Sequence, residues 1–221
     1  MTTSTAKTTI LEDADIAVAR QFAPQRDRPA MRTVSWFSGL GDSKPLLTVS
    51  GVVVAWGLLT GSARTARQGG QILASVLLAS VLKNGLKWAV ARSRPHLLLD
   101  RGIYDVELGG PTEKAWSSFP SGHAAASAAM AQACTRCWPE ARVPAYLGAA
   151  VLGLSRVPLG KHYPTDVLAG VLVGLAAATL VGRAFPPDGS AREAYRAPRS
   201  ERPASDQIGN GPRSAERQQL A

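Results

Sequence analysis

Five apolar segments, separated by arginine-rich polar stretches, most constrain how this chain can fold. They are rich in Ala, Leu, Val and Gly, and small residues let transmembrane helices pack closely. Several are shorter than the roughly 20 residues that a perpendicular bilayer crossing needs, so flanking residues are expected to extend the helices. We therefore expect an all-α, integral-membrane helical bundle of about five spans. The expected spans cover residues 45–60, 71–90, 124–134, 143–154 and 167–181.

A soluble protein with an alanine-rich helical core is the alternative fold, since the fourth segment alone would suit either class. Lys83 and Lys87, near one end of the second segment, either snorkel to the membrane interface or face an internal polar site. The net charge of +9 could indicate nucleic-acid binding. Several arginines lie beside apolar segments, however, where cations meet anionic headgroups, and the sequence contains no nucleic-acid motif. We therefore expect contact with membrane lipids and no nucleic-acid partner.

The residues before the first span predict an amphipathic helix over residues 10–22, which carries too many charges to cross a bilayer. We expect it either to lie on the membrane interface or to cap the bundle. Residues 10–185 form the predicted membrane domain, between a flexible N-terminus (1–9) and a disordered, Arg- and Pro-rich tail (186–221). The expected apolar stripe of the helix is Ile10, Ala14, Ala17, Val18 and Phe22, and its expected polar surface includes Glu12, Asp13, Asp15 and Arg20.

Three short stretches at the edges of the apolar segments carry the candidate chemistry. The first contains Lys87 and Arg94, which are seven residues apart and therefore share one helical face. Pro95 follows and disfavours continuing the helix. Two cations on one face can hold a phosphate, and arginine offers a planar fork of donors. Taken alone, the pair is more simply interpreted as a routine basic cluster at a helix end.

The second stretch, Pro120-Ser121-Gly122-His123, immediately precedes an alanine-rich helix. Backbone N–H groups at a helix N-terminus favour an anion, and Gly122 allows close approach to the backbone. The Ser121 hydroxyl can donate to a phosphate oxygen, or it can simply cap the helix. His123 can protonate a leaving alcohol oxygen, although a single histidine is more often structural.

The third stretch, which contains Ser155, Arg156, His162 and Asp166, joins the fourth apolar segment to the fifth. Asp166 falls in the first turn of a helix that Pro164 can start, where it can orient His162 or interact with the helix dipole. Counting spans places all three stretches on the same side of the bundle. We therefore predict one phosphate pocket, suited to transfer of a phosphoryl group to a histidine and then to water.

These residues resemble the signature of the type 2 phosphatidic acid phosphatase superfamily, which shares its site with vanadium haloperoxidases. The signature is K-x6-RP, PSGH and SR-x5-H-x3-D, and the chain reproduces it without a gap or substitution. The resemblance implies metal-independent, cofactor-free hydrolysis of a lipid phosphate or polyprenyl diphosphate through a phosphohistidine. It implies His162 as nucleophile, Asp166 as its orienting partner and His123 as acid. The implied phosphate-binding residues are Lys87, Arg94, Ser121, Gly122 and Arg156.

Bacterial lipid phosphatases of this family commonly have six spans, whereas five are counted here, so the N-terminus would lie on the catalytic side. The remaining arginines favour the opposite side as cytoplasmic, and we expect a bacterial inner-membrane protein whose site faces the periplasm. The segment from His96 to Phe119 is expected to be a long loop that contacts the headgroup or acts as a lid. The arginines that set this orientation are Arg64, Arg67, Arg136, Arg142 and those of the tail.

Two other functions are open from the sequence. A vanadate-dependent haloperoxidase would use the same residues, but the hydrophobic spans and the short chain argue against it. A catalytically silent membrane protein that binds lipid phosphates is disfavoured by the complete set of His162, Asp166 and His123. Cys134 and Cys137 are interpreted as small apolar residues of a helix, and no carboxylate cluster has metal-ligand spacing, so no metal is expected. The sequence leaves the lipid and the oligomeric state open.

Overall fold

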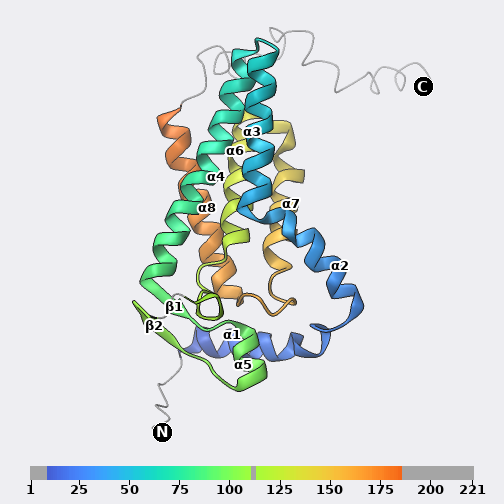
Figure 1. Cartoon of the computed structure of the whole chain (residues 1–221), viewed down its shortest axis with the longest axis vertical. Helices are drawn as coiled ribbons and strands as arrows, with labels where there is room; N and C mark the ends of the chain where they lie inside the picture. Colours follow the sequence, from blue (N-terminus) through green and yellow to red (C-terminus); the bar gives the residue numbers. More distant parts are fainter. Residues whose placement is uncertain (1–8, 111–112, 186–221) are drawn as a thin grey trace, which may run out of the picture. The chain divides into compact units, whose positions relative to one another are not determined.

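The computed structural model describes residues 9–110 and 113–185, and helices dominate this part of the chain. The apolar helices run alongside one another as a bundle (Figure 1). They coincide with the five apolar segments of the sequence, which confirms the expected all-α fold class. The five are α3 (Ser43–Leu59), α4 (Ala63–Ala89), α6 (Gly122–Cys137), α7 (Arg142–Leu154) and α8 (Pro164–Ala184).

The helix ends differ most from the prediction in α4, which starts at Ala63 rather than at residue 71. Its start is fixed by Ser62, whose hydroxyl accepts a hydrogen bond from the backbone N–H of Thr65 at 3.3 Å. By length and composition, α4 and α8 are each able to cross a bilayer, and α3 is a shorter apolar helix. The number of spans stays a prediction.

Close packing between α6 and α8 sets the geometry of the bundle. A Cβ atom at Gly170 would lie 2.4 Å from the carbonyl oxygen of Ser121, and one at Gly174 would lie 2.2 Å from that of Ala125. Both glycines therefore let the two backbones approach more closely than any side chain would permit. The facing side of α6 is almost entirely buried alanine. As a result, the first turn of α8 lies beside the first turn of α6.

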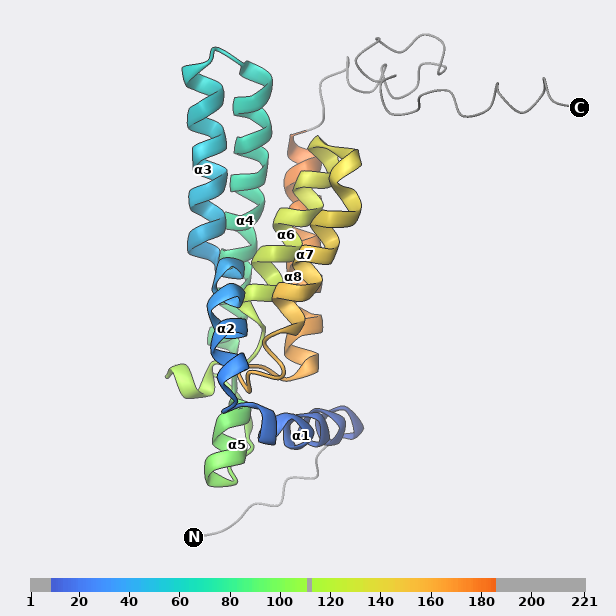
Figure 2. The ribbon, with the colours of Figure 1, turned by 90° about the vertical axis from the view of Figure 1, so that its right-hand side faces the viewer.

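Short elements cover the end of the bundle at which α4 ends and α6 and α8 begin (Figures 1 and 2). A two-stranded antiparallel ribbon follows α4 and pairs Val90 with Leu108. The segment 96–119, expected to be a loop, thus contributes a helix and a strand, because Pro95 starts a new helix and Gly102, at φ 68°, ends it. The elements are α1 (Ile10–Phe22), α2 (Pro29–Ser38), β1 (Val90–Arg92), α5 (Pro95–Arg101) and β2 (Val106–Leu108).

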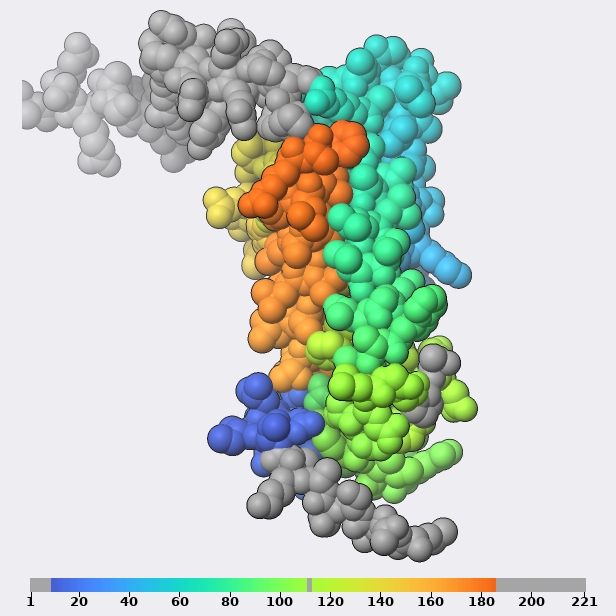
Figure 3. Space-filling model, turned by 90° about the vertical axis from the view of Figure 1, so that its left-hand side faces the viewer, coloured from blue at the N-terminus to red at the C-terminus, as the bar shows by residue number. Residues whose placement is uncertain are grey.

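The N-terminal helix α1 has the predicted bounds and lies directly against the start of α8 (Figure 3). Its buried face is not the predicted apolar stripe, since Ile10 is 87% exposed while Asp15 is only 2% exposed. The prediction that Asp15 lies on the polar surface is wrong because Arg92 and the backbone N–H of Thr165 hold its carboxylate inside. Helix α1 thus caps the bundle, as one of its two predicted placements required. The predicted flexible N-terminus and disordered tail fall almost wholly outside the described residues.

Candidate active site

The first two predicted cations meet at one peptide group. Lys87, in the last turn of α4, donates from Nζ to the carbonyl oxygen of Ser117 at 2.6 Å and to its hydroxyl at 3.0 Å. Arg94, the residue before α5, donates from Nη2 to the same carbonyl oxygen at 3.3 Å. After Arg94 the chain returns through the second strand of the ribbon, and Ser117 then lies beside Arg92. The two cations therefore lie side by side, but not on one helical face as predicted, because α4 ends at Ala89 and Arg94 follows β1.

His162 lies in the turn between α7 and α8 and is 3% exposed. Its Nδ1 atom is 2.8 Å from the carbonyl oxygen of Ser118. Because a carbonyl oxygen only accepts, Nδ1 must carry the proton, and the Nε2 atom of the neutral ring then carries the lone pair. This is the tautomer in which Nε2 can act as a nucleophile.

The surroundings of His162 also keep the ring neutral. Burial lowers the pKa of His162 from 6.5 to about 4, with Arg94 and Lys87 adding to the effect and Asp166 opposing it. Burial, followed by the charge of Arg94, lowers the pKa of Arg156 to about 10, so this guanidinium is still charged at neutral pH. The site therefore combines a neutral imidazole with several cations.

We expect the imidazole of His162 to stay neutral as the pH is lowered from neutrality and to become charged only as the pH falls through about 4. The sign follows from burial, which disfavours the charged form and so depresses the pKa of a histidine. NMR of ¹⁵N-histidine-labelled protein in detergent would measure it. The chain has only three histidines, so variants at His96 and His123 assign the signals. A titration midpoint near the ordinary value of 6.5 would contradict the prediction.

Asp166 is fully buried in the first turn of α8. Its Oδ2 atom lies 3.8 Å from Nδ1 of His162, which is too long for a direct hydrogen bond. Oδ2 instead accepts from the hydroxyl of Ser118 at 2.6 Å and from the backbone N–H of Tyr163 at 2.8 Å. Ser118 thus connects the two residues, because its carbonyl accepts from His162 while its hydroxyl donates to Asp166. The orienting contact predicted for Asp166 is indirect in this structure.

The second stretch is joined to the third through the backbone. The N–H of Ser121 donates to the carbonyl oxygen of Asp166 at 2.9 Å, and the Ser121 hydroxyl caps α6 by accepting from Ala124 N at 3.5 Å. A Cβ atom at Gly122 would lie 3.1 Å from Nζ of Lys83, so this lysine lies against the start of α6. Of the two placements open for Lys83, the structure therefore favours an internal polar site.

The remaining predicted residues lie in the same place. Arg156 is buried and donates from Nη1 to the hydroxyl of Ser38 in α2 at 2.7 Å. His123 lies within electrostatic reach of both Arg156 and His162. The Nε atoms of Arg94 and Arg156 are buried, and neither has an acceptor within the described part of the chain. Buried donors without acceptors are costly, and an anion would satisfy them. The eight predicted site residues therefore gather around one cationic centre.

Three residues of this centre carry no recognisable signal in the sequence. Ser117 and Ser118 act largely through carbonyl oxygens, which every residue type possesses, so their role cannot be predicted from the type of side chain. Arg92 lies inside the unspecified part of the first stretch and is one of many arginines in the chain. In the structure, Arg92 lies in the ribbon, and its side chain donates a hydrogen bond to Asp166 at 2.7 Å.

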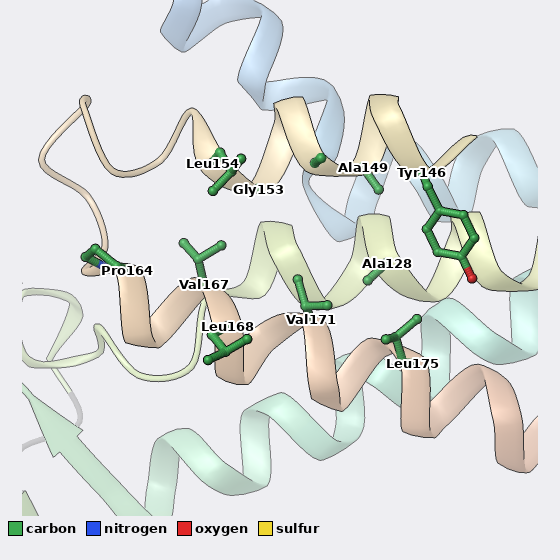
Figure 4. A pocket seen from close by; sticks show the side chains of 11 residues that line it. Ala128, Tyr146, Ala149, Gly153, Leu154, Pro164, Val167, Leu168, Val171 and Leu175 are labelled. Carbon is green, nitrogen blue, oxygen red and sulfur yellow. The ribbon is translucent and has the colours of Figure 1, made fainter. Parts of the chain in front are cut away.

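An apolar groove of about 370 Å³ runs beside this centre, between α7 and α8 (Figure 4). One end is formed by Gly153, Leu154 and Pro164, which are close in sequence to Arg156 and His162. The groove continues to Tyr146 and Leu175, and therefore follows about 16 Å of the α8 axis at 1.5 Å per residue. The hydroxyl of Tyr146 donates a hydrogen bond to the side-chain carbonyl oxygen of Gln132 in α6. The remaining lining side chains are Ala128, Ala149, Ala150, Val167, Leu168 and Val171.

The chain matches a family model and several known proteins. A family model described as the PAP2 superfamily matches residues 68–189. The chain is 33% identical over 178 residues to a lipid A 1-phosphatase of Rhizobium johnstonii, which covers 75% of this chain and 70% of that protein. It is 32% identical over 178 residues to a lipid A 1-phosphatase of Rhizobium etli, covering 75% of this chain and 73% of that protein.

Solved structures of other proteins share the fold. The crystal structure of Aquifex aeolicus LpxE matches with a TM-score of 0.57 and 20% identity, over 80% of this chain and 97% of that one. The transmembrane PAP2 type phosphatidylglycerolphosphate phosphatase from Bacillus subtilis matches with a TM-score of 0.56 and 25% identity, over 81% and 87%. The chain belongs to the PAP2 superfamily, which confirms the resemblance drawn from its motifs. It is a membrane phosphatase that hydrolyses a lipid phosphate, and this favours the enzyme over the haloperoxidase and the silent binder.

Proposed function

We propose that the chain removes the 1-phosphate group of a lipid of the lipid A type, with His162 as the nucleophile, and that it needs no metal ion or cofactor. The observation that carries the chemistry is the hydrogen bond from Nδ1 of His162 to the Ser118 carbonyl, which leaves Nε2 free to attack. The choice of lipid is supported by the two lipid A 1-phosphatases to which the chain is similar.

In the first step, Nε2 of His162 forms a bond to phosphorus as the bond from phosphorus to the lipid oxygen breaks. His123 donates its proton to that oxygen, so the lipid leaves as an alcohol. The phosphorylated imidazole carries positive charge, which the buried carboxylate of Asp166 stabilises. Lys87, Arg94 and Arg156 balance the charge of the phosphoryl oxygens, with the hydroxyl of Ser121 and the backbone at Gly122 as further donors.

In the second step, water attacks the phosphorus and transfers a proton to His123. The bond between nitrogen and phosphorus breaks, inorganic phosphate leaves, and His162 returns to its neutral form. The sum of the two steps is hydrolysis of a phosphate monoester by one water molecule. Protein cations take the part that a metal ion plays in other phosphatases, because they are preorganised around a buried site.

The same proposal places the protein in the bacterial inner membrane with its site facing the periplasm. The site lies at the end where α4 finishes and α8 starts. Arg64 and Arg67 at the start of α4, Arg136 near the end of α6 and Arg142 at the start of α7 lie at the opposite end of these helices. Positive residues beside short loops favour the cytoplasmic side.

Phosphate release by the purified full chain in detergent and EDTA tests the proposal. The panel would hold lipid A, phosphatidylglycerol phosphate, phosphatidate and a polyprenyl diphosphate, each assayed with the parent and with His162→Asn. We expect release that survives EDTA, the highest kcat/KM for the 1-phosphate of lipid A, and none with the variant. A preference for another lipid would overturn the substrate choice, whereas loss in EDTA restored by magnesium would overturn the mechanism.

We also expect the apolar groove to hold an acyl chain of the substrate. Val171 lines the groove, whereas its neighbour Leu172 is 59% exposed and does not. Val171→Phe should therefore raise KM for a long-chain lipid phosphate about tenfold, since excluding two methylenes costs about 1.6 kcal/mol at about 0.8 kcal/mol each. Kinetics with a short-chain, water-soluble phosphate ester should not change.

The matched control is Leu172→Phe, which adds the same aromatic ring to the exposed side of α8. It should leave KM for both substrates unchanged. An equal KM for the parent and Val171→Phe on the long-chain substrate would exclude the groove as an acyl site.

A further inference from the structure

A buried network behind Asp166 includes two residues that the family motifs do not specify. We propose that Arg92 of β1 and Asp15 of α1 are positioning residues for Asp166, which makes the N-terminal helix part of the catalytic machinery. The inference rests on the proposed roles of His162 and Asp166.

One guanidinium bridges two carboxylates from distant parts of the chain. Arg92 donates from Nη1 to Oδ1 of Asp166 at 2.7 Å and from Nη2 to Oδ2 of Asp15 at 2.8 Å. All three side chains are at most 6% exposed. Charge-assisted hydrogen bonds at these distances, shielded from water, are among the strongest contacts that a side chain makes.

Further contacts hold the two terminal nitrogens and one face of the guanidinium, whereas its Nε atom has no acceptor within the described part of the chain. Nη1 also donates to the hydroxyl of Thr165 at 2.8 Å, and Nη2 donates to the hydroxyl of Tyr104 at 2.9 Å. The ring of Tyr163 lies 4.3 Å from the guanidinium carbon, in a cation–π contact. Asp15 is held in turn by the backbone N–H of Thr165 at 3.1 Å. Asp15 therefore has a fixed position relative to the start of α8.

Arg92 also acts on the residue that orients the nucleophile. Its carbonyl oxygen accepts from the backbone N–H of Ser118 at 3.0 Å. The carbonyl of Ser118 accepts from Nδ1 of His162, and its hydroxyl donates to Asp166. Arg92 thus fixes the carboxylate of Asp166 through its side chain and, by way of Ser118, the imidazole of His162 through its backbone. The nucleophile and its orienting carboxylate therefore depend on the same residue.

Charge balance explains why two carboxylates face this one arginine. A guanidinium paired with Asp166 alone would neutralise the charge that stabilises the phosphorylated ring of His162. Asp15 shares the guanidinium, so the trio carries one net negative charge beside the imidazole. In a buried site of low effective dielectric, that charge attracts the phosphorylated imidazole much more strongly than it would in water.

The test compares Asp15→Asn with the parent in the purified full chain, with kcat and KM measured on a lipid phosphate that the parent hydrolyses. We expect kcat to fall by about tenfold or more, as removal of residues that orient catalytic groups commonly does, with KM unchanged. The matched control is Asp100→Asn. Asp100 pairs with Arg26 at 2.9 Å in a partly exposed contact that also involves the N-terminal region, and its loss should leave kcat unchanged.

Arg92→Lys and Arg92→Gln supply a second comparison. Lysine keeps the charge but reaches one carboxylate at a time, so its kcat should lie between those of the parent and Arg92→Gln. A purely structural role would lower the melting temperature and the yield of folded protein in all these variants, while each folded molecule kept its kcat.

Unchanged kcat in folded Asp15→Asn, or a loss equal to that of Asp100→Asn, would overturn the inference. If Asp15→Asn does not fold, equal kcat values for Arg92→Lys, Arg92→Gln and the parent would overturn it in the same way. Failure of the proposed function is distinguishable, because it appears as absent phosphate release by the parent or as retained release by His162→Asn.

Discussion

His162→Asn is expected to lower kcat for lipid phosphate hydrolysis on the order of 10⁴-fold or more, because the nucleophile of a covalent mechanism has no substitute. Asparagine is the informative choice. Its side-chain N–H₂ can donate to the carbonyl of Ser118 as Nδ1 of His162 does, so the buried hydrogen bond survives. The atom that corresponds to Nε2 is absent, and the variant therefore separates the nucleophile from the fold.

The measurement is initial-rate phosphate release, with binding of inorganic phosphate followed by calorimetry. Binding should persist in His162→Asn, because the cations of the site are unchanged. His96→Asn is the matched control. His96 lies in α5, and we expect its replacement to leave kcat within about twofold, as for an ordinary site outside the catalytic centre. Activity of His162→Asn close to that of the parent would exclude a phosphohistidine at this position.

Asp166→Asn is expected to cost kcat on the order of 10²-fold to 10⁴-fold, although the side chain changes by only one atom. The carboxylate accepts from Arg92, Ser118 and the backbone of Tyr163, so both of its oxygens face donors. An amide places its own donor against one of these groups, whichever way it is turned. Either Arg92 or the hydroxyl of Ser118 then loses its acceptor, and the phosphorylated His162 loses its nearest negative charge.

Steady-state kinetics of Asp166→Asn would show this effect as a loss in kcat with little change in KM. Asp105→Asn removes a carboxylate that caps the backbone N–H of Val106 on the ribbon, and serves as the chemically matched control. Its kcat should equal that of the parent within about twofold. A kcat for Asp166→Asn indistinguishable from that control would show that the buried carboxylate has no part in the reaction.

The sequence predicts the helices and the signature residues of this protein because both leave direct marks in residue type. Long apolar segments predict the helices. Small residues such as Gly170 and Gly174 indicate close helix packing, and in the structure both lie against the backbone of α6. Lys87 and Arg94 do reach the same carbonyl oxygen, but the shared helical face predicted from their spacing is wrong, because α4 ends at Ala89 and a strand separates the two residues.

The support of the site is hidden from the sequence for physical reasons. Ile10, Ala14 and Ala17 of the apolar stripe predicted for α1 lie on its exposed face, because a buried ion pair, rather than apolar burial, draws Asp15 inward. Periodicity measures hydrophobicity and therefore assigns a charged residue to solvent. The role of Ser118 depends on a carbonyl oxygen, and that of Arg92 on the pairing of a three-residue strand. Neither role can be predicted from the type of side chain.

The contact between α6 and α8 has a consequence for the evolution of the substrate range. The carbonyl of Ser121, against which Gly170 packs, belongs to the same turn that presents Gly122 and His123. A single methyl group at Gly170 would separate the two helix starts and widen the distance between acid and nucleophile. Diversification among descendants of this chain is therefore expected to proceed through the groove-lining and loop residues, while the glycine contact stays invariant.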